Sequence, residues 1–101
     1  MKLQAALDTL TLNECIDLLE ETEGFIDIAE VGTPFVIEEG MVPVKEFKKQ
    51  FPKIEVLADV KIMDAGEYEA DKCFDAGADI CTVLGVSHNE TIEGVVRSAK
   101  K

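Results

Sequence analysis

The sequence has 101 residues, 47% of them hydrophobic and 31% charged, so it can form the core of one small domain, which we expect to span residues 1–101. Ten basic and 21 acidic residues give a formal net charge of −11. A chain this acidic repels other polyanions, so neither nucleic acid nor an anionic membrane surface is expected as a partner.

The three cysteines, Cys15, Cys73 and Cys81, have no metal-ligand spacing. An odd number of isolated cysteines is typical of buried, reduced thiols in an intracellular protein. No apolar run approaches the length of a membrane-spanning helix, and the first residues have no signal-peptide pattern. These features predict a cytoplasmic protein without a membrane partner.

The first quarter of the chain predicts a strand, a helix and a second strand. Residues 3–8 form the first strand, and Thr11 with Glu14 makes a capping box, in which each side chain binds a free N–H group at the start of a helix. Apolar residues then recur at helical spacing until Gly24. The second strand is expected over residues 25–30.

The next segment, residues 31–40, is predicted to be a loop with room for one helical turn after Pro34. Pro43 suits the first turn of a helix, and Pro52 stops that helix. Residues 54–59 form the third predicted strand. The inward face of the helix is expected to carry Val44, Phe47 and Phe51, and its outward face Lys45, Lys48 and Lys49.

The last part of the chain repeats the helix–strand–helix pattern. A helix over residues 65–76 ends at Gly77, and residues 80–84 form the fourth strand. A second capping box, Ser87 to Glu90, is predicted to open the last helix. The expected core contacts of these two helices are Tyr68, Cys73, Phe74, Ile92, Val95, Val96 and Ala99.

Regular alternation of strands and helices indicates an α/β fold with parallel strands joined by right-handed crossovers. Two architectures fit this pattern: a small open, doubly wound sheet, or a (β/α)4 half of a TIM (β/α)8 barrel. In both, the active site lies at the C-terminal edge of the sheet. The residues that follow each strand are therefore the candidates for function.

An acidic residue occupies the end of each of the first three predicted strands: Asp8, Glu30 and Asp59. Asp59 and Lys61 are two residues apart, so an extended backbone would point both side chains to one face. Carboxylates gathered at one edge need a cation between them, and hard oxygen ligands suit Mg²⁺. The alternative is a purely structural network of salt bridges. His88, alone inside a capping box, is not expected to be catalytic.

Four segments together carry a resemblance to a known family. They are Leu3-Gln4-Ala5-Ala6-Leu7-Asp8, Ala29-Glu30-Val31-Gly32-Thr33-Pro34, Leu57-Ala58-Asp59-Val60-Lys61-Ile62-Met63-Asp64-Ala65-Gly66 and Thr82-Val83-Leu84-Gly85. With these segments the whole chain resembles the 3-hexulose-6-phosphate synthases of the orotidine-5′-monophosphate decarboxylase suprafamily. The Asp-x-Lys-x-x-Asp motif alone would identify only the suprafamily.

The resemblance implies an aldol-type lyase that condenses formaldehyde with D-ribulose 5-phosphate to D-arabino-3-hexulose 6-phosphate, through a Mg²⁺-stabilised enediolate. By position, Glu30 and Asp59 resemble the metal ligands and Asp8 a substrate-hydroxyl contact, with Glu30 also close to the substrate. Lys61 resembles the cation that stabilises the enediolate. Asp64 resembles the residue that each subunit of a homodimer lends to its neighbour's site. Asp59, Lys61 and Asp64 would then be the catalytic residues.

The resemblance departs from the family in length, because the family's members have about twice as many residues, as a TIM barrel requires. The later strands, which in the family carry the phosphate site, lie outside this sequence. The 101-residue chain alone is therefore expected to be incomplete as an enzyme. Two alternatives stay open: the sister activity, 3-keto-L-gulonate-6-phosphate decarboxylase, and a non-catalytic half-barrel assembly module.

Overall fold

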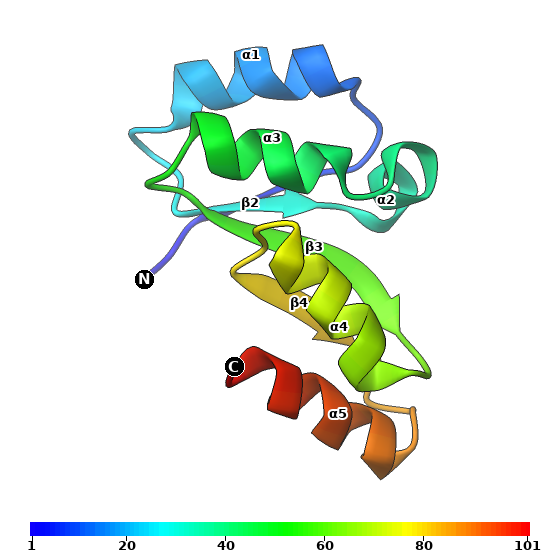
Figure 1. Ribbon diagram of the computed structural model, residues 1–101. Helices are drawn as coiled ribbons and strands as arrows, with labels where there is room; N and C mark the ends of the chain where they lie inside the picture. Colours follow the sequence, from blue (N-terminus) through cyan, green and yellow to red (C-terminus); the bar gives the residue numbers. More distant parts are fainter.

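The computed structural model describes residues 1–101 and alternates strands with helices along the chain (Figure 1). Its nine elements are β1 (Gln4–Leu7), α1 (Leu12–Thr22), β2 (Ile28–Val31), α2 (Thr33–Glu39), α3 (Val42–Gln50), β3 (Glu55–Ile62), α4 (Gly66–Asp75), β4 (Ile80–Val83) and α5 (Asn89–Ala99). None of the helices is both long and apolar enough to cross a membrane.

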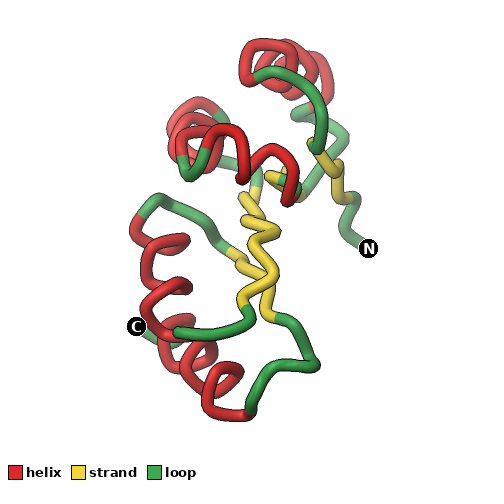
Figure 2. Tube along the Cα trace, turned by 90° about the vertical axis from the view of Figure 1, so that its right-hand side faces the viewer, coloured by secondary structure: helices red, strands yellow, loops and turns green.

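The four strands form one parallel sheet in the order β1-β2-β3-β4. Each strand pairs with the next one along the chain, so the strand order never reverses. A doubly wound sheet requires such a reversal, whereas a barrel wall does not. The helices lie along one side of the strands, and the other side carries no helix (Figure 2). The sheet therefore has the arrangement of one half of a barrel wall.

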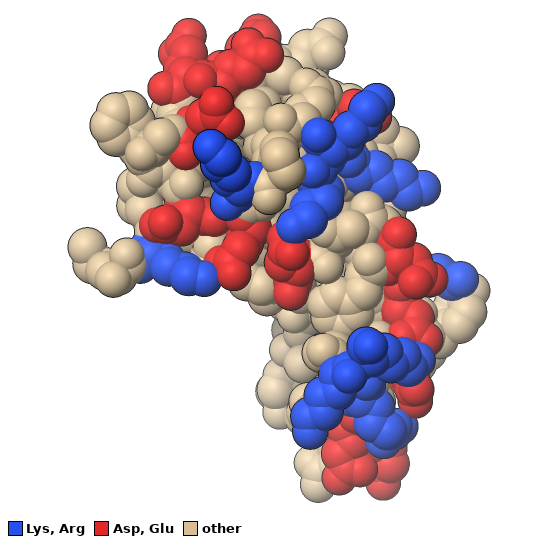
Figure 3. Space-filling model, turned by 60° about the vertical axis from the view of Figure 1, so that its left-hand side comes forward, with Lys and Arg blue, Asp and Glu red and all other residues tan.

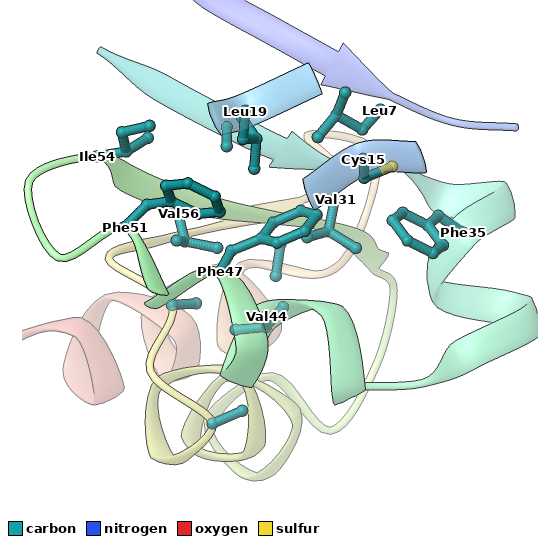
Figure 4. Packing of buried hydrophobic residues seen from close by; sticks show 14 of the residues in the cluster. Leu7, Cys15, Leu19, Val31, Phe35, Val44, Phe47, Phe51, Ile54 and Val56 are labelled. Atoms are coloured by element: carbon teal, nitrogen blue, oxygen red, sulfur yellow. The ribbon is translucent and has the colours of Figure 1, made fainter. Parts of the chain in front are cut away.

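The main core lies between the sheet and its helices (Figure 4). Strand residues Val31 and Val56 and helix residue Phe47 are all fully buried there. Phe47 of α3 packs on Phe35 of α2 with ring centroids 6.3 Å apart and planes tilted by 56°, a favourable arrangement for aromatic rings. The predicted inward residues Val44, Phe47 and Phe51 are all buried, so this prediction is confirmed.

Three boundary predictions were wrong. The segment predicted as a loop is α2, which begins after Gly32 and holds Pro34 in its first turn, where proline is tolerated, with Phe35 buried. Phe25 is 80% exposed, because the second strand begins only at Ile28. β3 continues to Ile62 and does not end at Asp59.

The predictions for the last two helices need correction as well. Tyr68 is 66% exposed, and the Lys72 ammonium lies 5.0 Å from its ring centroid. The first capping box at Thr11 is present, but the second is not: His88 is the N-cap of α5 without a side-chain bond, and the Ser87 hydroxyl donates to the Leu84 carbonyl at 2.7 Å. The buried face of α5 consists of Thr91, Gly94, Val95 and Ser98, so Val96 and Ala99 are exposed.

The small residues of α5 face α4 because the two helices approach very closely. A Cβ atom added to Gly66 would lie 2.1 Å from the Thr91 carbonyl oxygen, and one added to Gly94 would lie 2.8 Å from the Glu67 amide nitrogen. The contact is closed on the outside by an ion pair between Arg97 and Glu67 at 3.1 Å. The two glycines thus set the distance between these helices.

Two of the three cysteines, Cys15 and Cys73, are buried as expected, whereas Cys81 is only partly buried. Cys15, Cys73 and Cys81 are free, and burial raises the pKa of the Cys15 thiol to about 11. On the face in Figure 3, Lys and Arg side chains form separate groups with Asp and Glu beside them.

Gly66→Ala should destabilise the fold by roughly 1–3 kcal/mol, because the added methyl group overpacks a contact made by backbone. The direction is opposite to the usual gain from replacing a helical glycine by alanine. Urea unfolding measures the effect. Gly24→Ala is the matched control, since an added Cβ there meets nothing within 4 Å. Equal stability of the two variants would contradict the close approach of α4 and α5.

Candidate active site

The Asp59 carboxylate is held by donors from three elements. Thr82 of β4 donates to Oδ1 at 2.8 Å, and Thr33 of α2 approaches Oδ2 at 3.1 Å. The Lys61 ammonium also donates to Oδ2 in an ion pair. The Asp59 side chain is 15% exposed and that of Lys61 48%, so the carboxylate sits inside the cluster and the ammonium reaches its surface.

Two opposing influences act on the charge of Asp59. Partial burial raises the pKa of the carboxyl group, but the hydrogen bonds from Lys61, Thr82 and Thr33 lower it by more. The net pKa lies below its ordinary value. Asp59 is therefore ionised at neutral pH, which any role as a cation ligand requires.

Lys61 reaches Asp59 by an unexpected backbone path. Its φ is +52°, in the left-handed region that non-glycine residues seldom adopt. Here the register of β3 and β4 slips, with Ala58 opposite Cys81 but Ile62 opposite Val83. A regular extended strand was the sequence-based reason to expect Asp59 and Lys61 on one face. The two do meet, but through a β-bulge, so that reason was wrong.

Glu30 lies on β2 and faces the same side of the sheet as Asp59. It pairs in register with Leu57, and Asp59 is two residues farther along β3, so strand alternation points both carboxylates away from the helices. Gln4 of β1 donates to the Glu30 carboxylate at 2.6 Å. Both predicted metal ligands thus come from neighbouring strands on the face that carries no helix.

The carboxylate donors at this edge are compatible with one kind of Mg²⁺ site, an open one. No group of three or more His, Cys, Asp or Glu side chains is placed to hold a metal ion. Mg²⁺ is commonly bound by one or two carboxylates, with water and substrate oxygens completing its octahedron. Glu30 and Asp59 fit such an open site and do not form a closed structural one.

Asp8 follows β1 and packs against the backbone of Gly32. A Cβ atom added to Gly32 would lie 1.7 Å from the Asp8 Oδ1 atom, so only glycine leaves room for this carboxylate. The next residue, Thr33, contacts both Asp59 and Lys61. The Gly32-Thr33 segment therefore brings Asp8 to the same edge of the sheet as the Asp59 cluster.

Asp64 stands apart from these residues. It is exposed in the loop between β3 and α4, and it makes no hydrogen bond or ion pair within the chain. The neighbouring Met63 is 49% exposed. His88 is likewise exposed at the start of α5. The structure brings Asp8, Glu30, Asp59 and Lys61 to one edge of the sheet and leaves Asp64 pointing outward from the chain.

Three polar residues of the cluster belong to the segments that resemble the family, but no role was predicted for them: Gln4, Thr33 and Thr82. Thr82 could have been found by alternation, because β4 presents every second residue to the open face. Thr33 lay in the segment mistaken for a loop. For Gln4, only its place on β1 indicates a role in the cluster.

Comparison with known proteins identifies the family. The model of the orotidine 5′-phosphate decarboxylase / HUMPS family matches residues 1–101. The chain is 55% identical over 101 residues to a 3-hexulose-6-phosphate synthase of Bacillus subtilis and 45% identical over 100 residues to one of Mycobacterium gastri. It covers 48% of each of these proteins, so it spans about half the length of the curated relatives it matches.

Solved structures agree with the sequence comparison. 3-Hexulose-6-phosphate synthase from Salmonella typhimurium superposes with a TM-score of 0.96 at 52% identity, over 99% of this chain and 47% of that one. 3-Keto-L-gulonate-6-phosphate decarboxylase from Vibrio cholerae gives 0.93 at 30% identity, over 98% and 46%. These neighbours are TIM-barrel proteins, which confirms the predicted fold class. The chain belongs to the orotidine 5′-phosphate decarboxylase / HUMPS family.

Proposed function

We propose that this chain forms the metal- and lysine-bearing half of a 3-hexulose-6-phosphate synthase. The reaction is the aldol-type condensation of formaldehyde with D-ribulose 5-phosphate, and the enzyme class is an aldehyde-lyase. The observation that carries the proposal is the ionised Asp59 beside the Lys61 ammonium at the open edge of the sheet. The names of relatives up to 55% identical support the same reaction.

The reaction needs a group that stabilises negative charge. A base removes a proton from C1 of the ketose phosphate and leaves an enediolate, whose C1 then forms a bond with the formaldehyde carbon. The formaldehyde oxygen takes up a proton to become a hydroxyl group. A fixed ammonium such as Lys61 stabilises the enediolate without changing its own protonation. Its half-exposed side chain can reach a substrate above the sheet.

The metal in this proposal is Mg²⁺, with Glu30 and Asp59 as its protein ligands. When bound, Mg²⁺ would neutralise charge on the substrate oxygens. Gln4 holds the Glu30 carboxylate and the two threonines hold Asp59, so both ligands are oriented by neighbours that bind through hydrogen bonds. Asp8, for whose carboxylate Gly32 leaves room, is the proposed contact for a substrate hydroxyl group.

We propose Asp64 as a residue that acts in the site of a second subunit. Its carboxylate has no partner within the chain, and it follows the bulge of β3 on an exposed loop. A homodimer that places this loop against the neighbouring site would give the charge a partner. The cytoplasm is the compartment proposed for the enzyme, because three free thiols, two of them buried, suit reducing conditions.

The sister reaction is the second candidate. The Vibrio cholerae 3-keto-L-gulonate-6-phosphate decarboxylase superposes with a TM-score of 0.93, although at 30% rather than 52% identity. Loss of CO₂ from its substrate also leaves an enediolate, so Lys61 and the acidic cluster would stabilise that intermediate in the same way. Turnover of the two substrates, measured side by side, distinguishes the candidates.

A chimera tests the proposed function. This chain should replace the matching half of the Bacillus subtilis relative and preserve Mg²⁺-dependent consumption of formaldehyde with ribulose 5-phosphate. Asp59→Asn in the chimera should lower the rate by at least about a hundredfold, as loss of a charge-stabilising group does. Asp17→Asn, the same change at an exposed position of α1, is the control. A folded chimera without activity, or an active one unaffected by Asp59→Asn, would contradict the proposal.

The position of Asp8 gives a separate prediction. Gly32→Ala should force the Asp8 carboxylate away and lower kcat/KM of the chimera by roughly tenfold or more, the worth of one hydrogen bond to a charged group. Mg²⁺ affinity should change little, because Glu30 and Asp59 are untouched. Gly85→Ala, where an added Cβ meets nothing within 4 Å, is the control. Unchanged kinetics in Gly32→Ala would remove Asp8 from the site.

A further inference from the structure

We propose that Thr82 is a positioning residue of this site: its single hydroxyl group fixes both the carboxylate of Asp59 and the backbone of Lys61. The inference rests on the proposed function for its purpose, since that function assigns these two residues to the metal ion and the enediolate. Thr82 itself is not proposed to touch the substrate. Thr82 belongs to one of the four segments that resemble the family, but that resemblance implies no role for it.

The Thr82 hydroxyl bridges the two residues in a defined direction. It donates its only proton to Asp59 Oδ1 at 2.8 Å and accepts the backbone N–H of Lys61 at 2.9 Å. A hydroxyl has one donor and two acceptor sites, so donation to the carboxylate leaves a lone pair for the amide. Hydrogen bonds arranged head to tail in this way also polarise and strengthen one another.

The amide of Lys61 needs this acceptor because the strand ladder is broken there. The three residues of β3 between Ala58 and Ile62 lie opposite a single residue of β4, which is Thr82 between Cys81 and Val83. The Thr82 oxygen takes the place of a backbone carbonyl for the Lys61 N–H group. Regular pairing resumes immediately afterwards, where the Leu84 N–H donates to the Ile62 carbonyl at 2.9 Å.

The same contact supports an unfavourable backbone conformation. A non-glycine residue with positive φ persists only where its surroundings hold it. Lys61 has φ of +52°, and its N–H bond to Thr82 is the contact that ties this residue's backbone to β4. Loss of the Thr82 hydroxyl would release the lysine backbone and the Asp59 carboxylate together. That double effect separates Thr82 from an ordinary hydrogen-bonding residue.

Thr33 provides the matched comparison. Its hydroxyl donates to the Asp59 backbone carbonyl at 2.7 Å. It also lies 3.1 Å from Asp59 Oδ2 and 2.5 Å from the Lys61 Nζ atom, so it touches the same two side chains. It makes no contact with the Lys61 N–H group. Thr33→Val and Thr82→Val therefore both remove a hydroxyl group from the cluster and keep a β-branched side chain. Only Thr82→Val also removes the hydrogen-bond acceptor of the Lys61 amide.

The test uses the 101-residue chain and two measurements: backbone amide hydrogen exchange and calorimetric titration with Mg²⁺. In Thr82→Val the Lys61 amide should exchange about tenfold faster or more. The Mg²⁺ dissociation constant should rise about 10–100-fold, as when a partner of a metal ligand is lost. Thr82→Ser should restore both values. Thr33→Val should leave the Lys61 amide unchanged, and protection of the Leu84 amide reports that the sheet is intact.

Several outcomes would overturn the positioning role of Thr82. If Lys61 exchange and Mg²⁺ affinity in Thr82→Val equal those of the unmodified chain, or if Thr82→Ser fails to restore them, the inference is overturned. Faster exchange at Lys61 and Leu84 alike would show a general loosening and would also overturn it. If the unmodified chain binds no Mg²⁺ without the other half of the barrel, the exchange of the Lys61 amide alone decides the role of Thr82, and the chimera tests the metal assignment of the proposed function.

Discussion

The arrangement of the open edge depends on one partly buried charge, the carboxylate of Asp59. Taking a carboxylate out of water is unfavourable unless hydrogen bonds replace the lost water. Here the replacements come from Thr33 of α2, Lys61 of β3 and Thr82 of β4, which lie far apart in sequence. The charge can be accommodated only when these elements are in place. It therefore links the helix after β2 to the strands β3 and β4.

β3 divides its residues between stability and chemistry. Val56 and Ala58 are fully buried against the helices, whereas Asp59 and Lys61 belong to the other face. Strand alternation produces this division at the start of β3, and the bulge alters it at the end. Because the helix side is packed by Phe47 and its neighbours, the backbone below the cluster is rigid. Rigid support of this kind is what a preorganised charge cluster requires.

The sequence was sufficient for the features that depend on local pattern. Alternating elements and apolar spacing predicted the parallel sheet, the helix carrying Phe47 and the Thr11 capping box. It was insufficient where tertiary contacts decide. α2 forms because Phe35 finds a core contact, and the bulge at Lys61 needs Thr82 from another strand. Tyr68 is exposed because α4 buries Gly66, Ala70 and Cys73 instead. The acidic strand ends were visible in the sequence, but the threonines that orient them were not.

A structural salt-bridge network was the plain alternative to a functional site, and the energetics argue against it. An ion pair whose lysine is 48% exposed stabilises a fold by only about 0–1 kcal/mol. A non-glycine residue at positive φ costs of order 1–3 kcal/mol. The Asp59–Lys61 pair is therefore worth no more than the backbone strain at Lys61 that accompanies it. The ion pair alone therefore does not account for the strained bulge, which is the arrangement that the role proposed for Lys61 requires.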